Sequence, residues 1–101
     1  MANTAKVLFR GAATTNTATV LYTVPSATTT IITDIVVTNT TATSGTFTIA
    51  LDDVSIATAV SVGAYDSTVI SIKQALATTK TIKGGASATT INFHISGVEI
   101  S

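Results

Sequence analysis

The stretch Thr46–Ala57, TFTIALDDVSIA, decides the fold. Large apolar residues alternate with small ones on both sides of Asp52-Asp53, a period of two that is typical of strands with one face in a core. The pair Asp52-Asp53 predicts the turn between them, because Asp tolerates turn geometry and hydrogen-bonds its own backbone. The positions predicted to face inward are Phe47, Ile49, Leu51, Val54, Ile56, Val60 and Val62. The stretch therefore predicts an antiparallel hairpin.

The same alternation continues along the rest of the chain. It predicts strands near 5–10, 17–24, 30–39, 45–51, 54–62, 67–73, 79–83 and 89–96, separated by Pro25 and by glycines. The further positions predicted to face inward are Val7, Phe9, Val20, Tyr22, Val24, Ile31, Ile35, Val37, Thr68, Ile70, Ile72, Ile91, Phe93 and Ile95. After Gly97 the apolar phase shifts, which predicts a bulge or bend there. Residues 73–79 are expected to form one helical turn at most.

Seven to eight short strands at this spacing predict an all-β, antiparallel β-sandwich, either immunoglobulin-like or jelly-roll. The chain has 101 residues, which indicates one domain over 1–101. It has no cysteine, which excludes disulfides and thiolate metal sites. Charged residues make up 10% and the net charge is zero, which argues against electrostatic binding to nucleic acid or to an anionic membrane. No apolar run has the length of a signal peptide core or a membrane span.

No catalytic or cofactor-binding pattern stands out. The single histidine, His94, lies on a polar strand face without the neighbours that a nucleophilic triad needs. Asp52 and Asp53 are the one acidic pair, and Asp34 and Asp66 would join them in a calcium site only if the fold brought all four together. We therefore expect no enzyme activity, no cofactor, no metal and no small-molecule substrate.

Two other clusters have a functional and a structural interpretation. Lys73, Lys80 and Lys83 form either a small basic patch or a guard against stray pairing of an edge strand, and the neutral composition favours the guard. The tyrosines are the available sugar-stacking platforms; the phase of Tyr22 points it inward, which leaves Tyr65. The threonines lack the regular spacing that an ice-binding face needs.

Several apolar residues lie at positions that the alternation predicts to face outward. Burying an unpaired Lys or Glu costs several kcal/mol, whereas an unpaired Thr hydroxyl costs roughly 1–3 kcal/mol. A surface of hydroxyl and small apolar side chains is therefore easily desolvated, which suits assembly. The residues that we expect to form an interface, from the N-terminal strand and this outward set, are Lys6, Leu8, Arg10, Leu21, Ile32 and Val36.

The order of three segments resembles a group of small virion proteins of tailed phages. The segments are LYTVPSATTTIITDIVVTNTTATSGTFTIALDDVSIA, then STVISIKQAL, then TIKGGASATTINFHISGVEI, over about residues 17–100. Members of that group often carry a glycine where this chain has Asp52-Asp53, a difference that affects a turn type. The resemblance implies a non-enzymatic structural protein of the capsid decoration (cement) type or a related head or tail accessory.

That resemblance gives specific expectations. The protein would form a homo-oligomer, by analogy a trimer, and bind the phage major capsid protein on the capsid surface of the virion after synthesis in the host cytoplasm. It would bind neither nucleic acid nor membrane. The alternative is a tail, head-fibre or baseplate accessory that recognises host glycan, with Tyr65 as its exposed aromatic.

Overall fold

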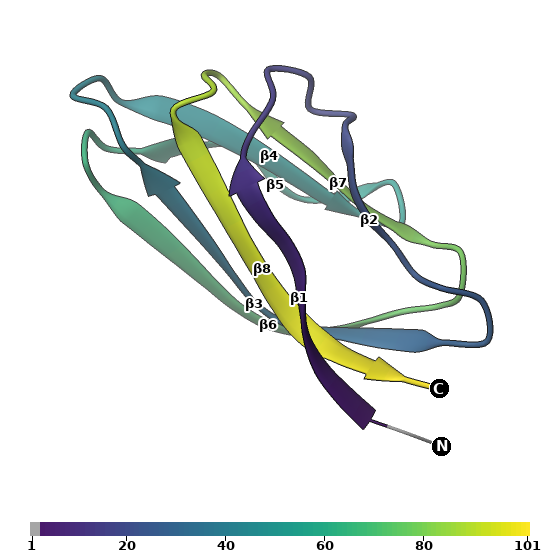
Figure 1. Cartoon of the computed structure of the whole chain (residues 1–101). Coiled ribbons are helices and arrows are strands. Elements are labelled where there is room, and N and C mark those ends of the chain that lie inside the picture. The colour runs from purple at the N-terminus through teal and green to yellow at the C-terminus, as the bar shows by residue number, and fades with distance from the viewer. Residues whose placement is uncertain (1–2) are drawn as a thin grey trace.

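The computed structural model describes residues 3–101, which form eight strands joined by turns (Figure 1). The strands are β1 (Asn3–Ala12), β2 (Val20–Thr23), β3 (Thr29–Asn39), β4 (Gly45–Leu51), β5 (Val54–Val62), β6 (Ser67–Leu76), β7 (Thr81–Ala86) and β8 (Ile91–Ile100). Each strand predicted from the alternation overlaps one of these. Residues 73–79, for which the sequence allowed one helical turn at most, form none: 73–76 extend β6, and Lys80 N donates to Ala77 O at 3.1 Å to close a turn.

The strands form two antiparallel four-stranded sheets packed face to face, which confirms the predicted β-sandwich. Sheet A has the order β1-β8-β3-β6, and sheet B has the order β2-β7-β4-β5. The pairs β1/β8, β2/β7, β3/β6 and β4/β5 are nested, as if one long hairpin had been wound around itself. This is the connectivity of a jelly roll, one of the two topologies that the sequence left open.

The core lies between the two sheets. Phe47 of β4 and Phe93 of β8 meet edge to face across the layers, with ring centroids 6.3 Å apart and an interplanar angle of 70°. The predicted inward residues Ile35, Val37 and Ile49 are fully buried around them. The sandwich is thus held by the alternating residues from which it was predicted.

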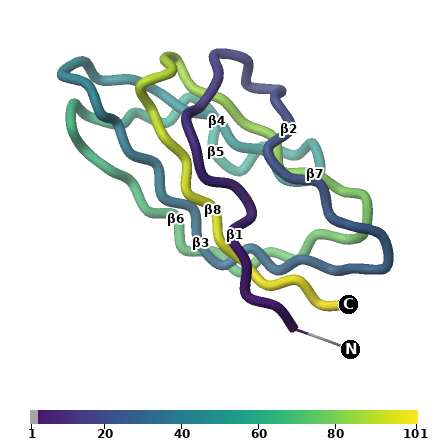
Figure 2. The backbone as a smooth tube through the Cα atoms, in the orientation of Figure 1, coloured from purple at the N-terminus to yellow at the C-terminus, as the bar shows by residue number. Residues whose placement is uncertain are grey.

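Bulges in sheet A reverse the predicted orientation of four residues. Both strands beside β8 carry one extra residue: Leu8 of β1 stands opposite the step from Ile95 to Ser96, and Thr33 of β3 stands opposite the step from Ser96 to Gly97. The bend near the middle of β1 is visible in Figure 2. The extra residues shift the phase, so Leu8 and Ile32 face the core, 7% and 0% exposed. Their predicted outward placement is wrong, and so is the predicted inward placement of their neighbours Val7 and Ile31, which lie on the outer side of the sheet.

The irregularity predicted at Gly97 is therefore found in the two neighbouring strands, β1 and β3, and not in β8, which continues regularly to Ile100. Gly97 is a glycine because of these bulges. A Cβ atom there would stand 2.9 Å from Leu8 Cδ1 and would also collide with the backbone carbonyl of Ile31.

Bulges in sheet B change the orientation of other predicted residues. Leu21 is an extra residue in β2, packs against the core, and leaves Val20 exposed, the reverse of both predictions. The strand β5 carries extra residues against β4 at two places, at Ile56 and within Thr58-Ala59. Ile56, an extra residue, is 40% exposed. Val54 and Val60 pair directly with buried Leu51 and Phe47 and keep the predicted side of the sheet, but on the edge strand they are 67% and 37% exposed.

Two loops complete the frame. Asp52 and Asp53 form the predicted hairpin turn with φ of 52° and 61°, the sign at both positions that a type I′ turn requires. The segment between β1 and β2 folds against β7: Gly84 N donates to Thr19 O at 3.0 Å and Ala86 N to Thr14 O at 2.9 Å. At the opposite end of β1, Asn3 pairs with Ile100, so the start of β1 and the end of β8 lie side by side (Figure 1).

Candidate interaction surfaces

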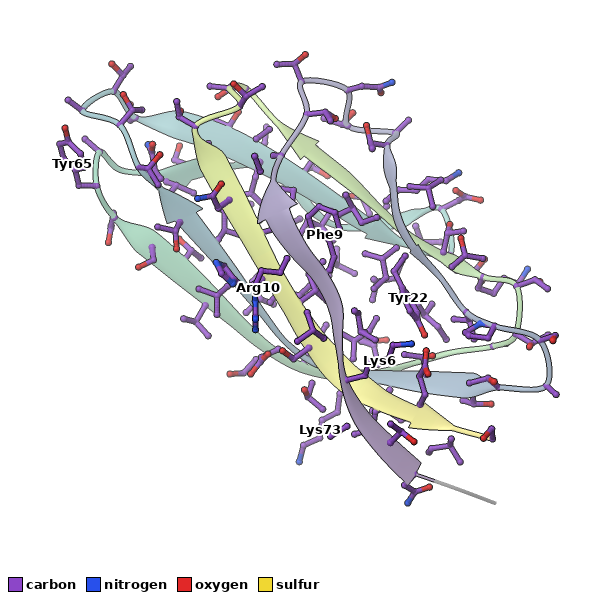
Figure 3. All side chains as sticks on the ribbon, in the orientation of Figure 1. Lys6, Phe9, Arg10, Tyr22, Tyr65 and Lys73 are labelled. Atoms are coloured by element: carbon purple, nitrogen blue, oxygen red, sulfur yellow. The ribbon has the colours of Figure 1, made fainter. Side chains whose placement is uncertain are left out.

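The outer face of sheet A is built from the residues that alternate with the core set. Register aligns it in four rows across β1, β8, β3 and β6: Ala5, Val98, Ile31 and Ala75; Val7, Ser96, Asp34 and Ser71; Arg10, His94, Val36 and Val69; Ala12, Asn92, Thr38 and Ser67. Of these sixteen side chains eight are apolar and two, Arg10 and Asp34, carry a formal charge. Arg10 lies across the near face of the sheet in Figure 3. We call these four rows the sheet A face.

The predicted interface residues are divided by the fold. Arg10 and Val36 both lie on the sheet A face, in one row. Leu8 and Ile32 are buried, and Leu21 packs against the core, so these three have little or no surface to offer. Lys6 is exposed but points toward sheet B. The role of Arg10, Val36 and Lys6 in an interface stays a prediction.

Lys6 belongs to a polar cluster that joins the two sheets. Its Nζ lies 3.4 Å from Glu99 Oε1, and Glu99 also accepts a hydrogen bond from the Tyr22 hydroxyl of sheet B (Figure 3 labels Lys6 and Tyr22). The Tyr22 hydroxyl is 2.8 Å from Oγ1 of buried Thr30 in β3. The cluster closes the side of the sandwich where β1 faces β2.

The cluster shifts the titration of both its acids. Burial, followed by the hydrogen bond to Glu99, raises the pKa of Tyr22 to about 12. The hydrogen bond from Tyr22, with the help of Lys6, lowers the pKa of Glu99 below its ordinary value. Tyr22 thus points inward, as predicted, and stays protonated as a donor while Glu99 stays ionised as an acceptor, which suits a structural bridge between sheets.

A second exposed apolar surface follows β5, the edge strand of sheet B. Val54, Ile56 and Val60 are three of the seven large apolar side chains that are exposed among residues 3–101. No charged residue occurs in β5. We call these three residues the β5 apolar edge. Sequence reasoning missed it because the alternation placed all three in the core.

Tyr65, the predicted sugar platform, is 73% exposed on the turn between β5 and β6 (Figure 3). Its φ is 55°, and its backbone N donates to Thr41 O at 3.1 Å. Asp66 N donates to Gly63 O at 3.1 Å, which closes the turn. The turn thus presents an exposed aromatic ring on an anchored backbone.

The three clustered lysines do not form one patch. Lys80 pairs with Asp52 at 3.6 Å and Lys83 with Asp53 at 2.6 Å beside the β4–β5 turn. The pairing lowers the pKa of Asp53, chiefly through the hydrogen bond from Lys83. Lys73 lies instead on the edge strand β6, where the predicted guarding role fits; Lys83 lies on β7, inside sheet B.

The remaining features to place are possible metal ligands, His94, one cavity and possible membrane helices. Within residues 3–101 no three His, Cys, Asp or Glu side chains gather as metal ligands. His94 lies between Arg10 and Val36 on the sheet A face. A shallow cavity of about 470 Å³ opens at the β3–β6 irregularity, lined by Thr33, Ser71, Ile72 and Lys73. Over residues 3–101 there is also no helix with the length and apolarity to span a membrane.

Comparison of the chain with protein-family models, with curated proteins and with solved structures finds no match. The surfaces described above are therefore the ground for a functional proposal, together with the resemblance of the sequence segments.

Proposed function

We propose that this protein is a non-enzymatic structural component of a tailed-phage particle, and specifically a capsid decoration protein that binds the assembled shell. The observation that carries the proposal is the β5 apolar edge: three exposed aliphatic side chains on an uncharged strand. Exposed apolar side chains that gather in one place mark a surface for a partner. The resemblance of the sequence to small phage virion proteins supplies the class of partner, the major capsid protein.

The geometry of β5 also favours one mode of contact. Its two irregularities against β4 bend the strand, and bulges of this kind protect edge strands from pairing with another strand. The partner would therefore cover the side chains of Val54, Ile56 and Val60 rather than extend sheet B. The jelly-roll topology is compatible with this role, because viral capsid domains share it, but lectin domains share it too.

The mechanism is mass action. A protein that binds the assembled shell, and not its free subunits, stabilises the shell by the free energy of binding at each occupied site. Many modest contacts then act together against internal pressure. Loss of the aliphatic contacts would lower occupancy without changing the fold of the free protein.

The test is binding to undecorated capsids of the phage that encodes the protein. We expect saturable, stoichiometric binding, weakened more than tenfold by Val54→Glu, because a carboxylate buried without a partner costs several kcal/mol. Val20→Glu is the matched control: Val20 is 51% exposed on β2, the opposite edge of sheet B, and we expect its variant to bind as the parent does. Absence of saturable binding by the parent protein would overturn the proposal.

A second candidate is a tail, head-fibre or baseplate accessory that binds host glycan, and the exposed ring of Tyr65 favours it. Aromatic rings stack on the apolar faces of sugars. Asp66, the residue after Tyr65, adds a carboxylate to the same turn. A glycan array probed with the parent and with Tyr65→Ala separates the candidates. Glycan binding that Tyr65→Ala abolishes supports the second, and binding to capsids without any glycan signal supports the first.

A further inference from the structure

The charges of this protein fall into two groups. Three lysines pair within the molecule, Lys6 with Glu99, Lys80 with Asp52, and Lys83 with Asp53. Among residues 3–101, four charged residues belong to no such ion pair: Arg10 and Asp34 on the sheet A face, Lys73 at the β6 irregularity opposite Thr33, and Asp66 on the turn between β5 and β6. An arginine and an aspartate thus lie on the sheet A face without an internal ion-pair partner, and the exposed Lys73 lies at the β6 edge of that face.

Their positions make that face complementary to itself. Arg10 lies on β1 and Asp34 on β3, one row and two strands apart, with β8 between them. A two-fold axis that places Arg10 opposite Asp34 of a second copy also places Asp34 opposite that copy's Arg10. The fourteen other side chains of the face are apolar or polar without a formal charge at neutral pH, so no like charges need to meet.

The free edges of the sandwich favour contact through a face rather than strand pairing. β1 carries the Leu8 bulge with Lys6 and Arg10, β2 has four residues, and β5 has two irregularities. On β6 the two residues Ile72 and Lys73 stand opposite the single Thr33. Bulges, short strands and lysines are the devices that prevent edge-to-edge association.

The size of the face is sufficient for a specific but modest contact. Four strands about 4.8 Å apart and about ten residues long cover roughly 600 Å². Two copies would then bury about 1,200 Å² in total, the lower limit of the standard interface class. Val69 is 62% exposed and Val7 44% exposed on this face, and both would be covered.

We propose that the sheet A face is a two-fold self-association surface, on which Arg10 of each copy pairs with Asp34 of the other. The expected species is a dimer that dissociates in the micromolar range. It is a property of the free protein and does not depend on binding to a capsid. It differs from the three-fold assembly that the resemblance implies, because a face with paired complementary charges closes in pairs.

The test is sedimentation equilibrium of the full chain from about 1 to 300 µM. We expect a monomer–dimer equilibrium for the parent, and a dissociation constant raised more than tenfold by Arg10→Asp or by Asp34→Arg. An equimolar mixture of these two variants should form a heterodimer, because one contact keeps the native pair and the other gains a pair of reversed sign. Native mass spectrometry identifies that heterodimer directly.

Two further variants on exposed valines keep the proposal falsifiable if a charge reversal disturbs folding. Val69→Glu on the sheet A face should abolish dimerisation, whereas Val54→Glu on β5, an equally exposed valine of sheet B, should leave it unchanged. A parent protein that stays monomeric at 300 µM, or that forms a trimer, overturns the proposal. Dimerisation that survives Val69→Glu overturns it as well.

Discussion

Gly97 shows how one residue accommodates irregularities in two neighbouring strands. The extra residue Thr33 of β3 stands opposite the step from Ser96 to Gly97, and the side chain of the extra residue Leu8 of β1 reaches the space beside the Cα atom of Gly97. The Ile31 carbonyl fills the position that a Cβ would take. Neither neighbour can retreat easily, because Leu8 is buried in the core and Ile31 belongs to a central strand.

We therefore expect Gly97→Ala to lower the free energy of unfolding by about 1–3 kcal/mol, the usual cost of overpacking a filled site. Urea denaturation followed by circular dichroism measures it. Gly63→Ala is the matched control, since a Cβ there meets Asp66 Cβ at 3.6 Å, an ordinary contact. Equal effects of the two substitutions would show that the close packing at Gly97 is not limiting.

At the scale of the element, the β4–β5 turn holds two aspartates in left-handed backbone conformations, Asp52 at φ 52° and Asp53 at φ 61°. Asp adopts this conformation more readily than most residues, but glycine does so without strain. A type I′ turn favours glycine at its second central position. The side chain of Asp53 contributes an exposed ion pair with Lys83, and exposed pairs contribute little to stability.

Asp53→Gly is therefore expected to raise the free energy of unfolding by up to about 1 kcal/mol. Asp53→Ala is the comparison, because it removes the same carboxylate and keeps a Cβ at positive φ. The glycine variant should unfold at a higher urea concentration than the alanine variant. A glycine variant no more stable than the alanine variant would mean that the turn holds no appreciable strain.

The strands could be predicted from the sequence where each pairs with its neighbours without a bulge. Alternation located all eight strands and the buried faces of β3, β4 and β8 beyond their irregular ends. It failed at Val7, Leu8, Val20, Leu21, Ile31 and Ile32, because one inserted residue exchanges the two faces of a strand. On β5 it failed because an edge strand leaves residues on its inward side uncovered. A bulge leaves no mark in composition.

One signal for the irregularity of β5 was present in the lengths. The predicted strand 54–62 has nine residues, whereas its hairpin partner 45–51 has seven. A two-residue turn joins them, so two residues of the longer strand either overhang or bulge. Ile56 is one of these extra residues. Its bulge and the edge position of β5 together leave Val54, Ile56 and Val60 exposed, and these three form the surface on which the functional proposal rests.

At the scale of the whole molecule, the bond between Tyr22 and Glu99 ties sheet B to sheet A, and it sets limits on the pH range of stability. The pKa of Tyr22 is raised to about 12, so the stability linked to it is complete below the ordinary value of 10.0 and is lost as pH rises toward 12. The pKa of Glu99 is lowered, so its contribution is complete above the ordinary value of 4.5 and is lost as pH falls below it.

Tyr22→Phe tests the alkaline limit. The variant should be less stable than the parent at pH 7, because Glu99 loses the hydroxyl that donates to it and Thr30 loses its hydrogen-bond partner. The difference in stability between variant and parent should shrink between pH 10 and 12. Thermal unfolding across that range measures the difference. Tyr65→Phe is the control, since Tyr65 is 73% exposed and should leave the pH profile unchanged. A constant difference between Tyr22→Phe and the parent would contradict the assignment.

The pairing of Asn3 with Ile100, which places the start of β1 and the end of β8 side by side, has a mechanical consequence. A force that separates the two ends opens the β1–β8 ladder from that end, one hydrogen-bonded pair after another. Resistance to such a pull is low, because the bonds break in succession and never share the load. A tether through the ends would thus be the weakest way to load this molecule, whereas compression across the sandwich is met by the whole core at once.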